Sequence, residues 1–360
     1  MRSRVLRVLG GVVQWARIAP GRRARGGVCL SYGHPHVPRI GEPVNGGMVK
    51  FQRLQEVWPN DPTRFNVLYL GSSSMPWDSR VLVRLARRRG AAVVWNQNGV
   101  AYPGWAGERT ERLNRPMAAV LHEADHVFFQ SEFCRLASDT FLGRRDGPAE
   151  ILYNAVDTDR FTPAARPSRP LTLLLGGSQY QWYRLERALL TTARLVERGR
   201  DVRLVVTGAL RWAEPGAAAR EAATLIGRLG LDDRVSLRGP YTQAEAPSML
   251  NGADILLHTK YNDPSPGLVV EAMACGLPVV YSASGGVPEL VGDDAGVGVP
   301  APLDWERDHP PGPDELADAV ETLAGRLDDY RVAARQRAVA RFALEPWLER
   351  HRQVFQELVR

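Results

Sequence analysis

Lysine is nearly absent from this chain of 360 residues, because Lys50 and Lys260 are the only lysines among 46 basic residues. Cysteine is scarce too: the three cysteines stand far apart without metal-site spacing, and their odd number suits a reducing compartment. No apolar run approaches the ~20 residues that a membrane-spanning helix needs. The basic N-terminal stretch is interrupted by charge and is followed by no small-residue cleavage site of a signal peptide. These absences disfavour a disulfide-rich secreted domain or a membrane span, and predict a cytoplasmic protein.

The composition that remains is that of a folded protein with an excess of positive charge. Hydrophobic residues make up 44% and charged residues 24%, and the length suits two domains. The net charge of +6 fits an anionic substrate or an anionic membrane surface, and no nucleic-acid motif accompanies it. Residues 1–26 are a basic leader, either loosely attached or an amphipathic helix that touches anionic lipid at the inner face of the membrane.

Strand and helix patterns alternate along nearly the whole chain, which predicts an α/β protein. A parallel, doubly wound sheet is expected in the first domain from short apolar runs at 27–32, 65–70, 91–95, 126–130 and 151–153. A second Rossmann-like unit is expected from similar runs at 171–175, 202–207, 234–238, 254–258 and 277–282. A Pro/Arg-rich run at 164–170 reads as the linker between the two.

Residues 254–291 form the most informative segment. A short apolar strand leads into a polar loop with two prolines, and a helix opens at Gly267. The free N–H groups and the dipole of a helix start attract phosphate. Asp263 in the loop and Glu271 in the helix can accept hydrogen bonds from sugar hydroxyls, and Lys260 adds a positive charge. Taken alone, the segment favours an ordinary βαβ unit whose acids are solvated on a surface loop.

The run from Asp263 to Glu271, with Gly285-Gly286-Val287-Pro288-Glu289 after it, resembles the acid-x7-Glu signature of family 4 GT-B glycosyltransferases. The usual first acid of that signature is Glu, one methylene longer than Asp263. The resemblance implies the GT-B fold, in which two Rossmann-like domains face each other across a cleft. It also implies transfer of a sugar from a UDP-, GDP- or dTDP-sugar to a hydroxyl, with retention of anomeric configuration and without a metal or other cofactor.

The resemblance also implies roles for individual residues. Glu271 would bind the ribose hydroxyls and Asp263 the transferred sugar. Backbone N–H groups at the helix start would bind the diphosphate, the loop after a strand would bind the base, and the first domain's Gly-Gly loop would lie at the ligand. The helix start is Gly267, Leu268 and Val269, the base-binding loop contains Gly239 and Tyr241, and the Gly-Gly loop is Gly46 and Gly47.

The chain departs from the family pattern at two places. The arginine that normally follows the first strand of the second domain is missing, so Arg184 and Lys260 are the candidates to replace the diphosphate cations. Asn98 stands where relatives often carry a histidine, and it can orient a hydroxyl or simply form the turn before Gly99.

The resemblance divides the chain into a leader (1–26), an abridged acceptor-side domain (27–163), a nucleotide-sugar domain (164–345) and a final helix (346–360) that crosses back to the first domain or packs on its own. The acceptor is a glycan, a lipid-linked saccharide or a small metabolite. Two rival functions stay open: a nucleotide-sugar epimerase of the same fold, and a catalytically silent nucleotide- or glycan-binding partner, which the missing cation would explain.

Overall fold

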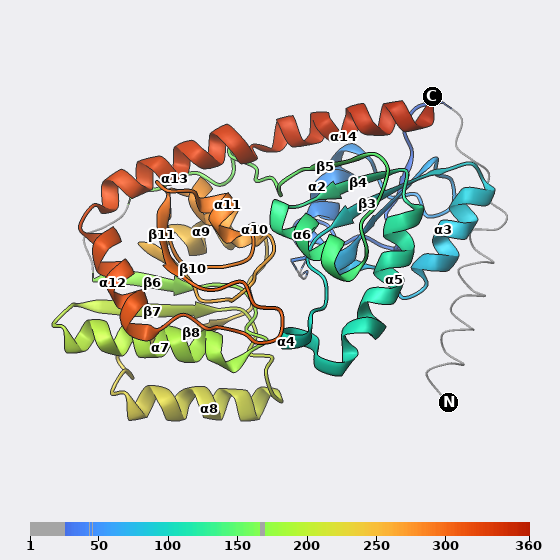
Figure 1. Cartoon of the computed structure of the whole chain (residues 1–360). Coiled ribbons are helices and arrows are strands. Elements are labelled where there is room, and N and C mark those ends of the chain that lie inside the picture. The colour runs from blue at the N-terminus through green and yellow to red at the C-terminus, as the bar shows by residue number, and fades with distance from the viewer. Residues whose placement is uncertain (1–25, 43, 45, 166–169) are drawn as a thin grey trace. The chain divides into compact units, whose positions relative to one another are not determined.

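The computed structural model describes residues 26–42, 44, 46–165 and 170–360, coloured in Figure 1. Nearly all of the predicted leader and most of the predicted linker lie outside the described residues. The chain divides into two compact units. Unit 1 holds the described residues up to Asn154 together with Glu345–Arg360, and unit 2 is Ala155–Leu344. Within the described part, every helix is too short or too polar to cross a bilayer.

Unit 1 is built on a parallel sheet whose described strands follow one another in chain order. The strands are β1 (Leu30–Ser31), β2 (Val67–Gly71), β3 (Ala92–Gln97), β4 (His126–Phe129) and β5 (Ala149–Ile151). The connecting helices are α2 (Val49–Val57), α3 (Ser79–Arg88), α4 (Pro103–Ala106), α5 (Thr110–Glu123) and α6 (Glu132–Phe141), with two short 3-10 helices, η1 (Ser72–Ser74) and η2 (Gly107–Arg109). Strands β2 to β4 are buried on both faces, as parallel strands between helical layers are.

In the first domain, the reversal of strand order expected for a doubly wound sheet is reduced to one bridge. All other named strands of unit 1 lie on one side of β1. The segment after α2 covers the free edge of β1: Asn60 pairs with Leu30, and the N–H of Asp61 donates to the Leu30 carbonyl at 2.9 Å. A short bridge thus takes the place that a further strand pair would fill.

The last helix, α14 (Leu344–Val359), packs in unit 1 through a cluster of rings. His351 is fully buried, with its ring centroid 4.1 Å from that of Trp347 and 4.6 Å from that of Phe128. Its Nδ1 donates to the Trp347 carbonyl, which leaves Nε2 to accept from the Tyr69 hydroxyl at 3.0 Å. Burial lowers the pKa of His351 to about 3, so the imidazole is neutral at physiological pH.

Unit 2 is doubly wound. Its strands are β6 (Leu171–Leu175), β7 (Val202–Thr207), β8 (Val235–Gly239), β9 (Ile255–His258), β10 (Val279–Ala283) and β11 (Gly296–Pro300), in the parallel order β11-β10-β9-β6-β7-β8. The helices are α7 (Trp182–Glu197), α8 (Pro215–Arg228), α9 (Ala246–Asn251), α10 (Gly267–Ala274), α11 (Val287–Val291), α12 (Pro313–Ala324) and α13 (Leu327–Phe342). The order reverses between β6 and β9, and ligands of such sheets bind beyond the carboxyl ends of the strands at that point.

Candidate functional site

Helix α10 begins beyond the carboxyl end of β9, close to the point where the strand order reverses. Pro266 stands at its N-cap with φ −74° and ψ 114°, and no side chain caps this end. A Cβ atom added to Gly267 would meet nothing within 4 Å, so the space beside the helix start is open. The start of α10 can therefore offer backbone N–H groups to a ligand, as the sequence predicts for Gly267, Leu268 and Val269.

The Gly285-Gly286 turn packs against the loop before α10 and fixes its position. The N–H of Gly286 donates to the Asp263 carbonyl at 2.9 Å. Gly285 has φ +68°, and a Cβ there would lie 2.4 Å from the Asp263 carbonyl oxygen, so no other residue fits this close approach. Asn262 adopts a positive φ of 48°, and its N–H donates to the Ser284 hydroxyl at 2.8 Å. The glycine pair thus fixes where Asp263 lies.

The Asp263 side chain is buried among basic groups. Its carboxylate lies 3.1 Å from Lys260 Nζ and accepts a hydrogen bond of 3.1 Å from His258 Nε2. Burial would raise the pKa of Asp263, but the charge of Lys260, the His258 hydrogen bond and the charge of Arg184 together lower it well below its usual value. Asp263 is therefore ionised at every pH of interest, and it links the two candidate cations.

Arg184 lies in α7 with 5% of its surface exposed, and the structure brings it close to Asp263. Its Nη1 donates to the Ser178 carbonyl at 2.9 Å, and its own carbonyl accepts from the Thr259 hydroxyl at 2.8 Å. The buried Nε has no hydrogen-bond partner among the described residues. Burial lowers the pKa of Arg184, and the charge of Asp263 opposes this effect. One donor of this guanidinium is thus left for a further acceptor.

The loop after β6 approaches the start of α10 closely. A Cβ added to Gly176 would lie 2.5 Å from Leu268 Cδ2, and one added to Gly208 would lie 2.3 Å from the Gly177 backbone. Both glycines allow neighbouring segments to approach the backbone closely near the point where the strand order reverses. The family pattern places an arginine in this loop, and this chain has Gly176 and Gly177 there instead.

Glu271 is buried in α10, and the predicted base-binding loop lies near it. Burial, and then the negative charge of Glu271, raises the pKa of the Tyr241 phenol well above its usual value. Gly239 ends β8 with φ +71°, and its carbonyl accepts the Gly208 N–H at 2.7 Å. Unit 2 thus carries the predicted donor residues on α10, in the loop before it, and at Tyr241 near Glu271.

The remaining predicted residues belong to unit 1. Gly47 must be a glycine, because a Cβ there would lie 2.7 Å from the Ser73 carbonyl oxygen, whereas Gly46 is exposed and unconstrained. Helix α2 begins at Val49, two residues after this glycine pair. Asn98 forms a turn: its Oδ1 accepts the Gly99 N–H at 2.5 Å, and its Nδ2 donates to Gln130 Oε1 at 2.6 Å.

A buried polar network in unit 1 includes Lys50. Lys50 lies in α2 with 5% of its surface exposed, and its Nζ donates to Asn96 Oδ1 at 2.7 Å. Gln130 donates to the same oxygen and so connects Lys50 to Asn98. Burial lowers the pKa of Lys50 to about 7. The scarcity of lysine in the sequence was the one signal for this position.

Sequence reasoning also missed His258, which directly contacts Asp263. A polar residue at the carboxyl end of an otherwise apolar buried strand was the available signal. Among the described residues, no group of three or more His, Cys, Asp or Glu side chains could hold a metal ion.

Comparisons with known proteins find sequence relatives for part of this chain. Residues 157–308 match the family model described as glycosyl transferases group 1. A D-inositol 3-phosphate glycosyltransferase of Mycobacterium sp. (strain KMS) is 28% identical over 183 residues, which are 48% of this chain and 40% of the relative. The chain therefore spans less than half the length of this curated relative.

Solved structures share the fold at low sequence identity. The sucrose-phosphate synthase of Thermosynechococcus elongatus has a TM-score of 0.68 at 20% identity, covering 82% of this chain and 74% of its own. Anabaena HepE in complex with UDP-glucose has a TM-score of 0.66 at 19% identity, covering 81% of this chain and 79% of its own. The chain therefore carries a glycosyl transferases group 1 region within the second of two Rossmann-like units, the architecture of the GT-B glycosyltransferases.

Proposed function

We propose that this protein is a retaining glycosyltransferase that moves a sugar from a nucleotide-sugar donor to a hydroxyl acceptor. One observation carries the proposal. The ionised Asp263 lies between Lys260, His258 and Arg184 beside the uncapped start of α10, inside the region that matches the family model. An ordinary surface βαβ loop would leave such a carboxylate solvated.

The donor would bind in unit 2. The N–H groups at the start of α10 and the free donor of Arg184 would bind the diphosphate, and Lys260 would turn from Asp263 to the phosphate oxygens. Glu271 would accept hydrogen bonds from the ribose hydroxyls, near Tyr241 and the base. Asp263 would orient a hydroxyl of the transferred sugar. No metal is needed, because helix start and cations supply the positive charge.

The transfer itself would follow a front-face route. The bond between the anomeric carbon and the diphosphate oxygen breaks while the acceptor oxygen forms a bond on the same face, and the departing phosphate takes the acceptor's proton. Negative charge develops on the leaving oxygen, so the helix start, Arg184 and Lys260 would bind the transition state more tightly than the ground state. Asn98, tied to Gly99 and Gln130, would hold the turn on the acceptor side.

UDP-sugars are the first donors to try, since Anabaena HepE was solved with UDP-glucose and the pneumococcal transferase GtfA with UDP and GlcNAc. The proposed place of action is the cytoplasm. The leader, residues 1–26, would make peripheral contact with the inner face of the membrane. The acceptor is a hydroxyl compound, and the matched relatives named for D-inositol 3-phosphate make phosphorylated polyols the first acceptors to try.

The test is a transfer assay with purified protein and UDP-, GDP-, dTDP- and ADP-sugars, in which released nucleotide and glycosylated product are both measured. We expect one donor to release nucleotide only when an acceptor is present, with product of retained configuration. Sugar conversion without any acceptor would instead identify an epimerase.

A silent binding partner is the second candidate, because Lys260 is paired with Asp263 and Arg184 with the Ser178 carbonyl. Tight nucleotide binding without turnover across the whole acceptor panel would favour that function and contradict the proposed one.

A further inference from the structure

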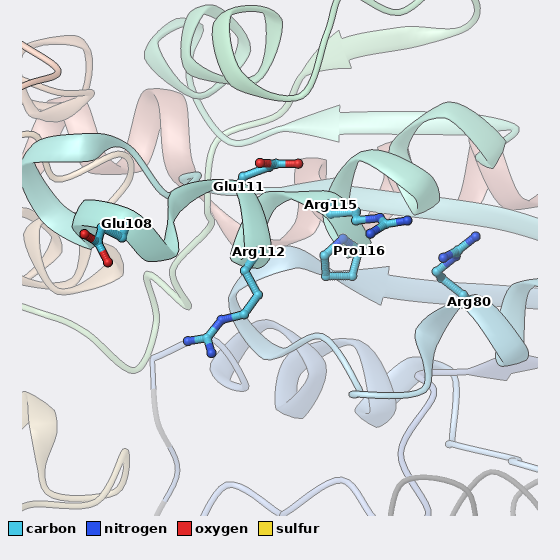
Figure 2. Close-up of a pocket in the computed structure, with 6 residues that line it drawn as sticks. All are labelled: Arg80, Glu108, Glu111, Arg112, Arg115 and Pro116. Carbon is cyan, nitrogen blue, oxygen red and sulfur yellow. The ribbon is translucent and has the colours of Figure 1, made fainter. Parts of the chain in front are cut away.

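A cavity of about 620 Å³ opens on unit 1, apart from all the predicted donor residues (Figure 2). Arg80 comes from the first turn of α3, Arg112, Arg115, Glu111 and Pro116 from α5, and Glu108 from η2. All five charged side chains are exposed, so a ligand can reach them. The cavity therefore combines three guanidinium groups with two carboxylates.

The three arginines of this cavity have no ion pair with any described residue. Elsewhere in unit 1 an exposed arginine finds a partner: Arg87 of the same α3 contacts Asp125 at 2.8 Å. Glu111 stands four residues before Arg115 on α5, the spacing at which helical ion pairs form. The pair is nevertheless not made, and in Figure 2 the Arg115 side chain extends away from Glu111.

Two of these guanidinium groups, those of Arg80 and Arg115, line the cavity from two different helices. Like charges that share a cavity without ion-pair partners repel each other, and an anion between them removes that cost. The planar guanidinium fork matches a phosphate group with paired hydrogen bonds. The cavity thus has the chemistry of a phosphate site.

The two carboxylates add a second requirement on the ligand. Glu108 and Glu111 can accept hydrogen bonds from hydroxyl groups but would repel a ligand that is anionic throughout. A compound with one phosphate and several hydroxyl groups satisfies both halves of the cavity. A simple polyanion such as a nucleic acid satisfies only one.

The cavity lies where substrates of parallel sheets usually bind. Helix α3 follows the carboxyl end of β2, and α4, η2 and α5 follow that of β3, so the cavity-lining N-terminal halves of α3 and α5 lie toward the sheet edge that also carries Asn98. Ligands of open parallel sheets bind at that edge.

We propose that the cavity lined by Arg80, Arg112 and Arg115 binds the phosphate group of a phosphorylated polyhydroxy compound, the acceptor of the transfer. That this compound is the acceptor rests on the proposed function, whereas its binding to the cavity does not. The phosphate comes either from a soluble compound or from the headgroup of an anionic lipid with free hydroxyls.

Binding is tested with the full chain, by calorimetric titration of a hexose 6-phosphate and of an inositol phosphate, each beside its unphosphorylated form. A parallel arm measures co-sedimentation with phosphatidylglycerol vesicles and with phosphatidylcholine vesicles. The variants are Arg80→Gln and Arg115→Gln. The matched control is Arg84→Gln, on an exposed arginine of the same α3 that does not line the cavity.

We expect a phosphorylated compound to bind saturably and its free polyol not to bind. Arg115→Gln and Arg80→Gln should each weaken binding about tenfold, added salt should weaken it further, and Arg84→Gln should leave it unchanged. The same variant pattern seen only with phosphatidylglycerol vesicles would support the site with a lipid source.

Absence of binding in both arms, or an equal loss in Arg84→Gln, overturns the proposal. Donor binding to the second unit is measured separately, so its failure would count against the proposed function and not against this site.

Discussion

The positive charge of Lys260, 3.1 Å from the Asp263 carboxylate, helps to keep that buried acid ionised. Removal of the lysine charge takes away the first of the groups that lower the pKa of the buried Asp263 carboxylate. It also removes a cation from the place proposed for the diphosphate. Lys260 is therefore the residue whose substitution should affect the donor most directly.

Lys260→Met should weaken nucleotide-sugar binding about tenfold, the loss expected for one charge-assisted hydrogen bond to phosphate. Lys260→Arg, which keeps the charge, should retain most of the affinity. Calorimetric titration of both variants gives the comparison. Equal affinities in Lys260→Met and the unaltered protein would remove Lys260 from the donor site.

Lys50 shows why a chain so rich in arginine keeps a lysine in α2. Its Nζ is buried against Asn96, and burial lowers its pKa to about 7, so the amine can shed its charge near neutral pH. Arginine stays charged under the same conditions. A guanidinium at this position would leave a permanent charge inside unit 1.

The lowered pKa of Lys50 predicts a pH dependence of stability. Below pH 7 the amine is protonated in both the folded and the unfolded chain, and above its ordinary pKa of about 10.4 it is neutral in both. Between these limits the unfolded chain binds the extra proton, so Lys50 makes the free energy of unfolding rise with pH, by up to about 1.4 kcal/mol per pH unit. Urea unfolding of Lys50→Met from pH 7 to 9 should show a correspondingly shallower rise. Parallel slopes for the two proteins would contradict the buried, uncharged state of Lys50.

At the scale of elements, the α10 segment depends on glycines for its geometry. Gly285→Ala would place a Cβ 2.4 Å from the Asp263 carbonyl oxygen at a φ of +68°. We expect it to lower the free energy of unfolding by about 1–3 kcal/mol and to abolish donor binding. Gly267→Ala, whose Cβ meets nothing within 4 Å, is the matched control for stability and should change it by no more than about 0.5 kcal/mol. Urea unfolding measures both, and similar costs would show that the turn does not fix the loop.

Elements with strong apolar patterns were predictable from sequence, and those without them were not. Strands β6 and β7 begin and end where their apolar runs do, and α10 begins at the predicted Gly267. Helix α13 was missed because its buried positions are two small residues, Ala334 and Ala338, and a single large one, Phe342. Strand β11 was missed because its sequence GVGVP reads as a loop.

The candidate site was predictable where local sequence determines it and not where distant segments meet. The acids and the helix start follow from one continuous segment. The contact of Arg184 with the Asp263 surroundings depends on how α7 packs beside β9, which no local pattern reveals. The glycine at position 296 illustrates the same limit: a Cβ there would lie 2.1 Å from the Val279 carbonyl oxygen, a neighbour known only from the fold.

At the scale of the whole molecule, the chain folds as two units, and the last helix completes the first of them. Phe355 of α14 lies with its ring centroid 5.2 Å from that of Trp58 and 5.8 Å from that of Tyr69. The aromatic core of unit 1 is therefore closed by residues nearly 300 positions later in the sequence, as the separation of 282 between Tyr69 and His351 illustrates.

Phe355→Ala should destabilise unit 1 by about 3–5 kcal/mol, the cost of deleting a buried aromatic side chain. Hydrogen exchange should then accelerate in β2, β3 and β4 while β6, β7 and β9 keep their protection. Val332→Ala, at an exposed position of α13, serves as the control and should change neither set. Equal acceleration in both units would contradict the division of the chain into two cooperative parts.

The central claim is that the start of α10, with Arg184 and Lys260, binds the diphosphate of a nucleotide sugar. The most direct measurement is a calorimetric titration of the unaltered protein with UDP and with uridine, repeated with Lys260→Met. The account predicts that UDP binds at least about tenfold more tightly than uridine and that this difference shrinks in the variant. Equal affinity for UDP and uridine, or a difference that Lys260→Met leaves intact, would contradict it.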